Sequence, residues 1–182
     1  MQKIREYHEL FSRLISEIDQ AALSKAVELV GQTYAADKQI FTAGNGGSAA
    51  VAVHLAADFG KNVAGPNDKP PRILTLCANV STITALGNDC GYETVFEGQL
   101  RNLMNPGDLV ILISASGNSP NVVQAARHAR ENGAAVLGFT GFDGGKLKEL
   151  SDVNLHAPSR CYEVVEDVHS FFAHALVYAS KK

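Results

Sequence analysis

Apolar side chains recur every three or four positions through the first part of the chain. The first run consists of Ile4, Tyr7, Phe11, Leu14 and Ile18, and a second run continues to Tyr34. This spacing places apolar groups on one face of a helix, so we expect two helices here, or one helix with an extension. Asp19 is a candidate cap for the second helix. Residues 1–36 are therefore expected to form a helical arm that covers the main body or a second subunit.

From Lys38 onward, short apolar segments alternate with helical ones. Strands are expected over Gln39–Ala43, Arg72–Leu76, Leu109–Ser114, Ala135–Thr140 and Val153–Ala157. Helices are expected over Ser48–Phe59, Val80–Leu86, Thr94–Met104, Asn121–Asn132, Leu147–Leu150 and Glu163–Ser180. The alternation predicts an α/β three-layer sandwich, with helices on both faces of a five-stranded, mainly parallel, doubly wound sheet. The length of 182 residues fits one domain, with residues 37–182 as its α/β body.

Composition narrows the class of protein. The chain is 46% hydrophobic and 19% charged with a formal net charge of −3, so we expect a globular protein without the basic surface that nucleic acid or an anionic membrane would require. The longest strongly apolar stretch, Leu109–Ile113, is too short to span a bilayer. Three widely spaced cysteines and an N-terminus unlike a signal peptide favour a cytoplasmic location.

A glycine-rich loop, Gly44-Asn45-Gly46-Gly47-Ser48, separates the first predicted strand from its helix. Glycines allow the backbone to approach a ligand closely, and the free N–H groups of a helix N-terminus suit an oxyanion or sugar hydroxyls. Gly44 and Gly46 fit the first two glycines of a dinucleotide fingerprint, and Ala49 takes the third place. No acidic residue ends the next strand to hold a ribose, so we expect no nucleotide cofactor. A plain glycine turn is the alternative.

A hydroxyl-rich loop, Ser114-Ala115-Ser116-Gly117-Asn118-Ser119, follows the third predicted strand and precedes Pro120. Three hydroxyls and a helix N-terminus can converge on one phosphate. No lysine accompanies the loop, which favours a sugar monophosphate over a nucleoside triphosphate. Ser119 is also a plausible helix cap, with Pro120 at the first helical position. Both loops follow parallel strands, so both are expected at the edge of the sheet where ligands bind.

The sequence GNGGSAA followed by His54, the SxSGNS loop and a C-terminal E-x-x-E-x-x-H run resemble the sugar isomerase (SIS) family. More narrowly, the chain resembles the phosphoheptose isomerases, which convert sedoheptulose 7-phosphate to D-glycero-D-manno-heptose 7-phosphate. The resemblance covers nearly the whole chain. It implies an isomerase with His54 as a metal ligand and His174 as a catalytic histidine that also binds the metal. The substrate-binding residues that it implies are Asn45, Gly46, Gly47, Ser48, Asn88, Asp89, Ser114, Ala115, Ser116, Ser119 and Glu166.

Four positions depart from the family pattern. The family has Glu at Asp58, Gln at Glu166 and a hydroxyl-bearing residue at Ala115, while Glu163 takes the place of an aspartate. Asp for Glu withdraws the carboxylate by one methylene, and Glu for Gln adds a negative charge. These changes leave open a different sugar phosphate as the substrate, or a loss of activity.

The spacing of the candidate metal ligands shows which of them can share one ion. His54 and Asp58 lie four residues apart and share one face of the predicted helix. Glu166 and His174 are eight apart, a rise of roughly 12 Å, so they reach one ion only if their side chains lean together or come from different subunits. Two histidines and two carboxylates fit one Zn²⁺ per subunit, or another borderline divalent ion. Each histidine taken alone could equally be structural.

Interconverting a ketose and an aldose requires a base for a carbon-bound proton and an acid that moves a proton between oxygens. We expect Asp58 to be the base and His174 its acid partner. The alternative to an enzyme is a non-catalytic protein that binds sugar phosphates or other proteins. Some relatives bind other proteins, such as a replication initiator. The apolar N-terminal helices and the resemblance both favour a homotetramer with sites at subunit interfaces.

Overall fold

The computed structural model describes residues 1–181, which contain one five-stranded sheet in which all paired strands are parallel. The order across the sheet is β2-β1-β3-β4-β5. Its strands are β1 (Gln39–Gly44), β2 (Arg72–Thr75), β3 (Leu109–Ser114), β4 (Ala135–Gly141) and β5 (Val153–Ala157). The predicted α/β sandwich is thus confirmed, and the sheet is wholly parallel.

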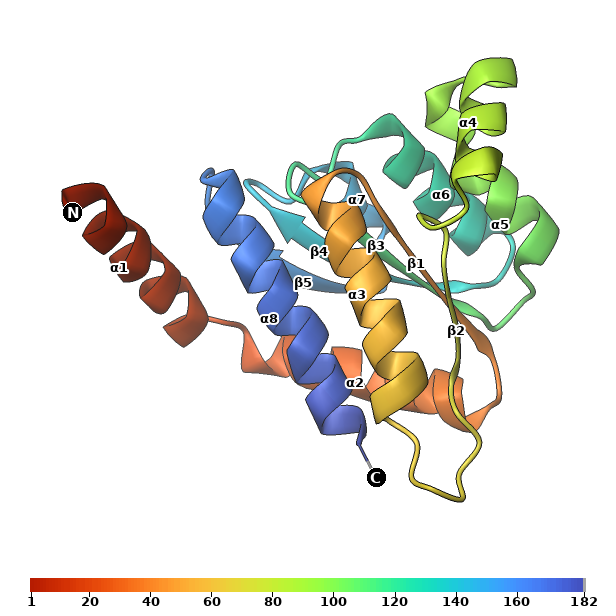
Figure 1. Ribbon diagram of the computed structural model, residues 1–182, viewed down its shortest axis with the longest axis horizontal. Helices are drawn as coiled ribbons and strands as arrows, with labels where there is room; N and C mark the ends of the chain where they lie inside the picture. Colours follow the sequence, from red (N-terminus) through yellow and green to blue (C-terminus); the bar gives the residue numbers. More distant parts are fainter. Residues whose placement is uncertain (182) are drawn as a thin grey trace.

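Helices cover both faces of this sheet (Figure 1). One face packs against α2 (Gln20–Ala35), α3 (Gly47–Asn62) and α8 (Tyr162–Ser180), and the other against α5 (Glu97–Leu103), α6 (Pro120–Glu131) and α7 (Gly145–Leu150). The remaining helices are α1 (Gln2–Ser16), α4 (Val80–Asp89) and the short 3₁₀ helix η1 (Tyr92–Thr94). No helix within residues 1–181 combines the length and the apolar character that a membrane crossing requires.

The central strand β3 divides the core in two, because its successive side chains point to opposite faces. Leu109, Ile111 and Ile113 belong to the core beneath α3 and α8, whereas Val110 and Leu112 belong to the core beneath α5 and α6. The chain leaves β1 for a helix on one face and leaves β3 for a helix on the other. The ends of these adjacent strands therefore form the topological switch point at which open α/β sheets bind ligands.

The N-terminal arm consists of two separate helices, and Asp19 caps the second by accepting hydrogen bonds from the N–H groups of Ala21 and Ala22. In Figure 1, α1 projects away from the sheet and approaches the body at α8. There the Tyr7 hydroxyl donates a hydrogen bond to the Asp167 carboxylate, which raises the pKa of Tyr7 to about 12. Ile4 stays 65% exposed on this helix. The division of the chain into arm and body stays a prediction.

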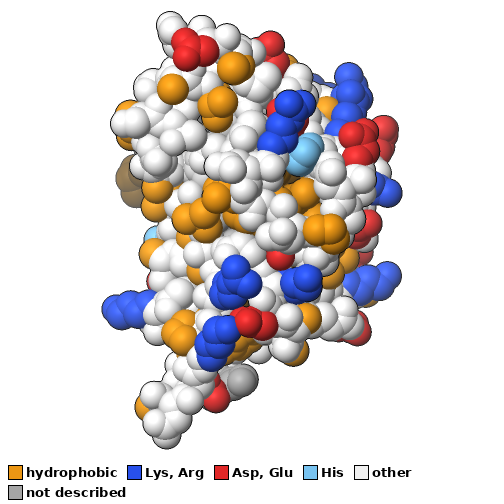
Figure 2. Space-filling view, turned by 90° about the vertical axis from the view of Figure 1, so that its right-hand side faces the viewer, with side chains coloured by type: hydrophobic (Ala, Val, Ile, Leu, Met, Phe, Trp, Pro, Cys, Tyr) orange, Lys and Arg blue, Asp and Glu red, His pale blue; other side chains and the backbone are white. Residues whose placement is uncertain are grey.

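Most predicted helices differ from the structure by one to three residues at an end, as two segments illustrate. The helix predicted over residues 94–104 begins only at Glu97, as α5, because Thr94 belongs to η1 and the turn between η1 and α5 buries Val95 and Phe96 in the core. The helix predicted to end at Leu86 continues to Asp89 as α4, which has no fully buried residue. Figure 2 shows the face that carries α4, α5 and the edge strand β2, where hydrophobic side chains are scattered among polar ones. Leu74, Val80 and Leu103 are exposed on these elements.

Acid is expected to destabilise the protein through His169, which is completely buried on α8 between the rings of Phe139 and Phe172. Burial lowers the pKa of His169 to about 4 from an ordinary 6.5, because the charged form loses its hydration. Below pH 6.5 the unfolded chain therefore binds a proton at this histidine, whereas the folded chain binds it only near pH 4. We expect the free energy of unfolding to fall by about 2 kcal/mol between pH 7 and pH 5 because of this residue. Urea unfolding of the protein and of His169→Leu at both values measures the effect, and an equal pH dependence in the two would contradict it.

Candidate active site

A cavity of about 140 Å³ lies at the switch point, where β1 and β3 end. Both loops singled out in the sequence contribute to it, together with the first turns of α3 and α8. Its lining consists of Asn45, Ser48, Ile113, Ser114, Ala115, Ser116, Ser119, Tyr162 and Glu166. We call this cavity the phosphate pocket. Seven of the eleven predicted substrate-binding residues line it, and Gly46 and Gly47 lie in the loop that borders it.

The serine hydroxyls of the second loop gather on one side of this pocket. Ser114 Oγ lies 3.4 Å from Ser119 Oγ and also accepts a hydrogen bond from the Gly117 N–H. Ser119 occupies the N-cap position of α6, but its side chain makes no capping hydrogen bond. Its hydroxyl therefore remains available to a ligand. Clustered hydroxyls beside the start of a helix form a suitable site for a phosphate group.

Glu166 also lines the phosphate pocket and lies against the first turn of α3. A Cβ atom at Gly47 would lie 2.3 Å from Glu166 Oε1, so the glycine leaves the space that the carboxylate occupies. The N-terminus of a helix carries a partial positive charge, which favours a carboxylate in this position. A carboxylate can accept hydrogen bonds from hydroxyl groups, so a substrate role for Glu166 stays a prediction.

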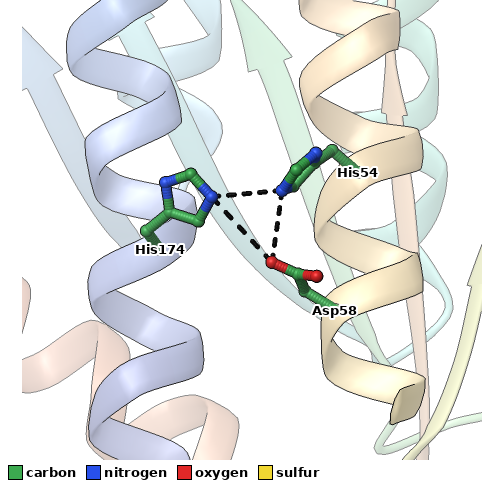
Figure 3. Close-up of side chains that lie close together, drawn as sticks. All are labelled: His54, Asp58 and His174. Carbon is green, nitrogen blue, oxygen red and sulfur yellow. Dashed lines mark hydrogen bonds and ion pairs between the residues drawn. The ribbon is translucent and has the colours of Figure 1, made fainter. Parts of the chain in front are cut away.

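A second group of polar side chains lies further along α3 and α8 and consists of His54, Asp58 and His174. His54 Nε2 is 3.2 Å from Asp58 Oδ2 and 3.1 Å from His174 Nε2, and His174 Nε2 is 3.9 Å from Asp58 Oδ2. Figure 3 shows the three side chains converging from the two helices. The side chains of His54 and His174 are 57% and 58% exposed, and that of Asp58 is 28% exposed. We call these residues the His-Asp-His cluster.

The cluster meets the requirements of a divalent metal. One ligand atom from each residue lies within 4.8 Å of the other two. Zinc binds imidazole nitrogen and carboxylate oxygen at about 2.0–2.2 Å in tetrahedral sites, so neighbouring ligand atoms stand a little over 3 Å apart. The separations in the cluster are close to this value. Three protein ligands also leave a fourth position open, as in catalytic sites.

The structure does not bring Glu166 to this cluster. Within the chain, the four predicted metal ligands divide into the cluster of three and Glu166, which lines the phosphate pocket. The reason is the spacing along α8, because eight residues of helix separate two positions by roughly 12 Å. A cavity of about 230 Å³, lined by His54, Ser170 and His174 among others, lies between α3 and α8. The phosphate pocket and the cluster therefore lie along the seam of the same two helices.

Asn88 and Asp89 lie outside the phosphate pocket of the single chain. Both are exposed at the end of α4, where Asn88 Nδ2 donates to Asp89 Oδ1 at 2.7 Å. Their role in substrate binding stays a prediction. Conversely, sequence reasoning missed Tyr162, which lines the pocket, and Tyr92 and Asn121, which contact Asn45. Asn121 follows the serine loop by two residues, a signal that could have been used, whereas no motif marks Tyr92 or Tyr162.

Known proteins are similar to this chain in sequence and in fold. Residues 4–141 match the SIS domain family. A phosphoheptose isomerase of Aliarcobacter butzleri is 40% identical over 170 residues, which is 93% of this chain and 89% of the relative. One of Campylobacter concisus is 35% identical over 177 residues, 97% of this chain and 92% of the relative. The structure of phosphoheptose isomerase GmhA from Neisseria gonorrhoeae has a TM-score of 0.90 at 32% identity and covers 98% of this chain and 95% of its own.

The fold and the site therefore define a SIS domain protein. Within that class, the chain belongs to the phosphoheptose isomerase family, which confirms the resemblance seen in the sequence. The expectation of an aldose–ketose isomerase is likewise confirmed by these relatives, and a binding protein without catalysis is not favoured.

Proposed function

We propose that this protein isomerises sedoheptulose 7-phosphate to D-glycero-D-manno-heptose 7-phosphate. The observation that carries the proposal is the arrangement along one seam: a hydroxyl-lined phosphate pocket at the start of α3 and α8, and the His-Asp-His cluster further along both helices. Relatives named phosphoheptose isomerase, at up to 40% identity over nearly the whole chain, support the substrate.

The separation of the two sites suits an extended sugar phosphate. Glu166 at the pocket and His174 at the cluster are eight residues apart on α8, a rise of roughly 12 Å. Seven carbons joined by bonds of about 1.5 Å, followed by a phosphate ester, span a distance of the same order. With the phosphate among the serines, carbons 1 and 2 of the ketose reach the cluster.

The residues of the cluster can then perform the proton transfers. Asp58, as the base, removes a proton from carbon 1 of the ketose to give an enediolate. His174 transfers a proton from the oxygen on carbon 1 to the oxygen on carbon 2, and the proton held by Asp58 returns to carbon 2. The product is the aldose, with no net gain or loss of electrons. Each positioned acid or base contributes about 10²–10⁴-fold to the rate.

We further propose that His54, Asp58 and His174 bind one Zn²⁺ per chain. Two imidazole nitrogens and a carboxylate oxygen are ligands that zinc favours. A bound divalent ion would stabilise negative charge on the substrate oxygens. For Glu166 to act as a fourth ligand, its carboxylate would have to leave the first turn of α3, or another subunit would have to supply it.

The metal content of variants distinguishes a zinc ligand from a residue that serves only the phosphate pocket. We expect about one zinc ion per chain in protein purified without chelator. His54→Ala should lose most of its zinc, because the two protein ligands that remain would hold the ion only weakly. Glu166→Gln is the matched comparison, and it should keep its zinc if Glu166 serves the phosphate pocket instead. Elemental analysis by mass spectrometry gives the ratios. Zinc lost equally from both variants would place Glu166 among the ligands, and chain purified free of metal and insensitive to chelators would contradict the site.

We also propose that the protein is a cytoplasmic homotetramer. The projecting helix α1 with its exposed Ile4, and the exposure of both cluster histidines, support burial of these surfaces by other subunits. The cysteines of the described chain, Cys77, Cys90 and Cys161, are all free thiols, as expected in a reducing compartment. Sedimentation equilibrium measures the oligomeric state, and a monomer at micromolar concentration would contradict the tetramer.

The isomerase reaction itself is tested with purified protein and sedoheptulose 7-phosphate, following the aldose product by proton NMR in the presence and absence of added zinc. Other ketose phosphates of five and six carbons serve as comparison substrates. Faster turnover of a shorter sugar would overturn the proposed substrate and retain the reaction. Tight binding of the heptulose phosphate without any turnover would overturn the proposed reaction.

A further inference from the structure

Asn45 lines the phosphate pocket, yet most of its hydrogen-bonding capacity is used within the protein. Its Oδ1 accepts from Asn121 Nδ2 at 2.9 Å and from the Tyr92 hydroxyl at 3.0 Å. Its Nδ2 donates to Asn121 Oδ1 at 2.9 Å. A carboxamide offers two lone pairs on oxygen and two hydrogens on nitrogen. The oxygen of Asn45 is therefore saturated, and one N–H remains for a ligand.

The backbone fixes which way both amides face. Asn121 is 2% exposed, and its Oδ1 also accepts the N–H of Val122 at 2.9 Å. A backbone N–H can only donate, so the atom of Asn121 that faces it must be the oxygen. The other end of this carboxamide is then a donor, and the atom of Asn45 opposite it must be an acceptor. Without the Val122 contact, the two amides could both turn over and keep the same pairing.

We propose that Asn121 is a positioning residue that presents Asn45 to the sugar phosphate as a hydrogen-bond donor. Asn121 itself does not line the phosphate pocket but lies behind Asn45, beside a neighbouring cavity that Tyr92 also lines. The free N–H of Asn45 would then meet an oxygen of the substrate, either a sugar hydroxyl or a phosphate oxygen. This inference rests on the proposed function, because it assumes that the pocket binds a sugar phosphate.

A double-mutant cycle tests whether Asn121 acts through Asn45. Asn121→Ala frees the Asn45 amide to rotate, and we expect the KM for sedoheptulose 7-phosphate to rise about five- to tenfold while kcat changes less than twofold. Asn45→Ala should give a similar rise. In the Asn45→Ala background, Asn121→Ala should cause no further change, because the residue that it orients is gone. Tyr92→Phe removes one of the two donors to Asn45 Oδ1 and should raise KM only about two- to threefold.

Asn154→Ala is the matched control. Asn154 is a partly buried amide that, like Asn121, is hydrogen-bonded to its neighbours, here Thr140 and Gly138, and it does not line the phosphate pocket. It should leave KM unchanged. Equal KM changes from Asn121→Ala in both backgrounds, or a KM unaffected by Asn121→Ala, would overturn the inference.

Calorimetric binding of sedoheptulose 7-phosphate, measured on the same variants, separates this inference from the proposed reaction. Binding that follows the expected cycle without turnover would overturn the reaction and support the role of Asn121. A failure of the unsubstituted protein to bind this ligand would overturn both.

Discussion

Replacing Asp58 by Asn is expected to lower kcat for sedoheptulose 7-phosphate about 10²–10⁴-fold, the contribution of a positioned general base. The amide keeps the shape of the side chain but cannot accept a proton from carbon. His174→Ala should have an effect of similar size because it removes the group that moves the proton between the substrate oxygens. Initial rates at saturating substrate and with zinc in excess give the comparison, and the zinc content of each variant is measured as well because both residues are also proposed zinc ligands.

Two further single substitutions in the otherwise unchanged protein test whether the loss of rate is specific to the carboxylate of Asp58. Asp58→Glu keeps a carboxylate at this position and is expected to retain turnover, since it adds only one methylene. Asp68→Asn removes an exposed carboxylate of the loop after α3, which accepts the Gly65 N–H, and should not change the rate. Retained turnover in both Asp58→Asn and His174→Ala would remove the assignment of base and acid.

Gly117→Ala is expected to destabilise the protein by about 2–5 kcal/mol and to abolish substrate binding, through backbone strain and overpacking together. Gly117 has a φ of +64°, and a Cβ there would lie 1.9 Å from the carbonyl oxygen of Gly144. The obstacle is backbone, which cannot rotate away as a side chain would. The Gly117 carbonyl also accepts the Leu147 N–H, so a shift would disturb the serine loop and α7 together.

Gly46→Ala provides the matched control for stability. Gly46 has a similar φ of +54°, but a Cβ there would meet nothing within 4 Å. Only the backbone conformation of Gly46, with φ +54° and ψ −122°, is then penalised, by about 1–3 kcal/mol. Urea unfolding of the two variants, with calorimetric binding of the sugar phosphate to Gly117→Ala, measures both effects. If the two alanine variants unfold alike, the contact with Gly144 does not require glycine at position 117.

The strands were predictable because each is a local pattern. The predicted limits of β3 and β5 coincide with those of the structure, and the other strands differ by one residue at an end. The candidate binding residues of the two loops were predictable in the same way, since both loops are short continuous motifs between a strand and a helix. The predicted end of α4 was three residues too early, because a helix that buries no residue has only a weak apolar pattern to mark its end.

The sequence by itself determined the parallel α/β fold, the two loops that line the pocket and the pairing of His54 with Asp58, because each of these depends on residues that are close together in the chain. Only the tertiary structure decided which distant residues meet. It brought His174 to the other two residues of the cluster, placed Glu166 beside Gly47 at the phosphate pocket, and joined Asn45 to Asn121 and Tyr92. Such contacts depend on how whole helices pack across the sheet, and no local spacing encodes that packing.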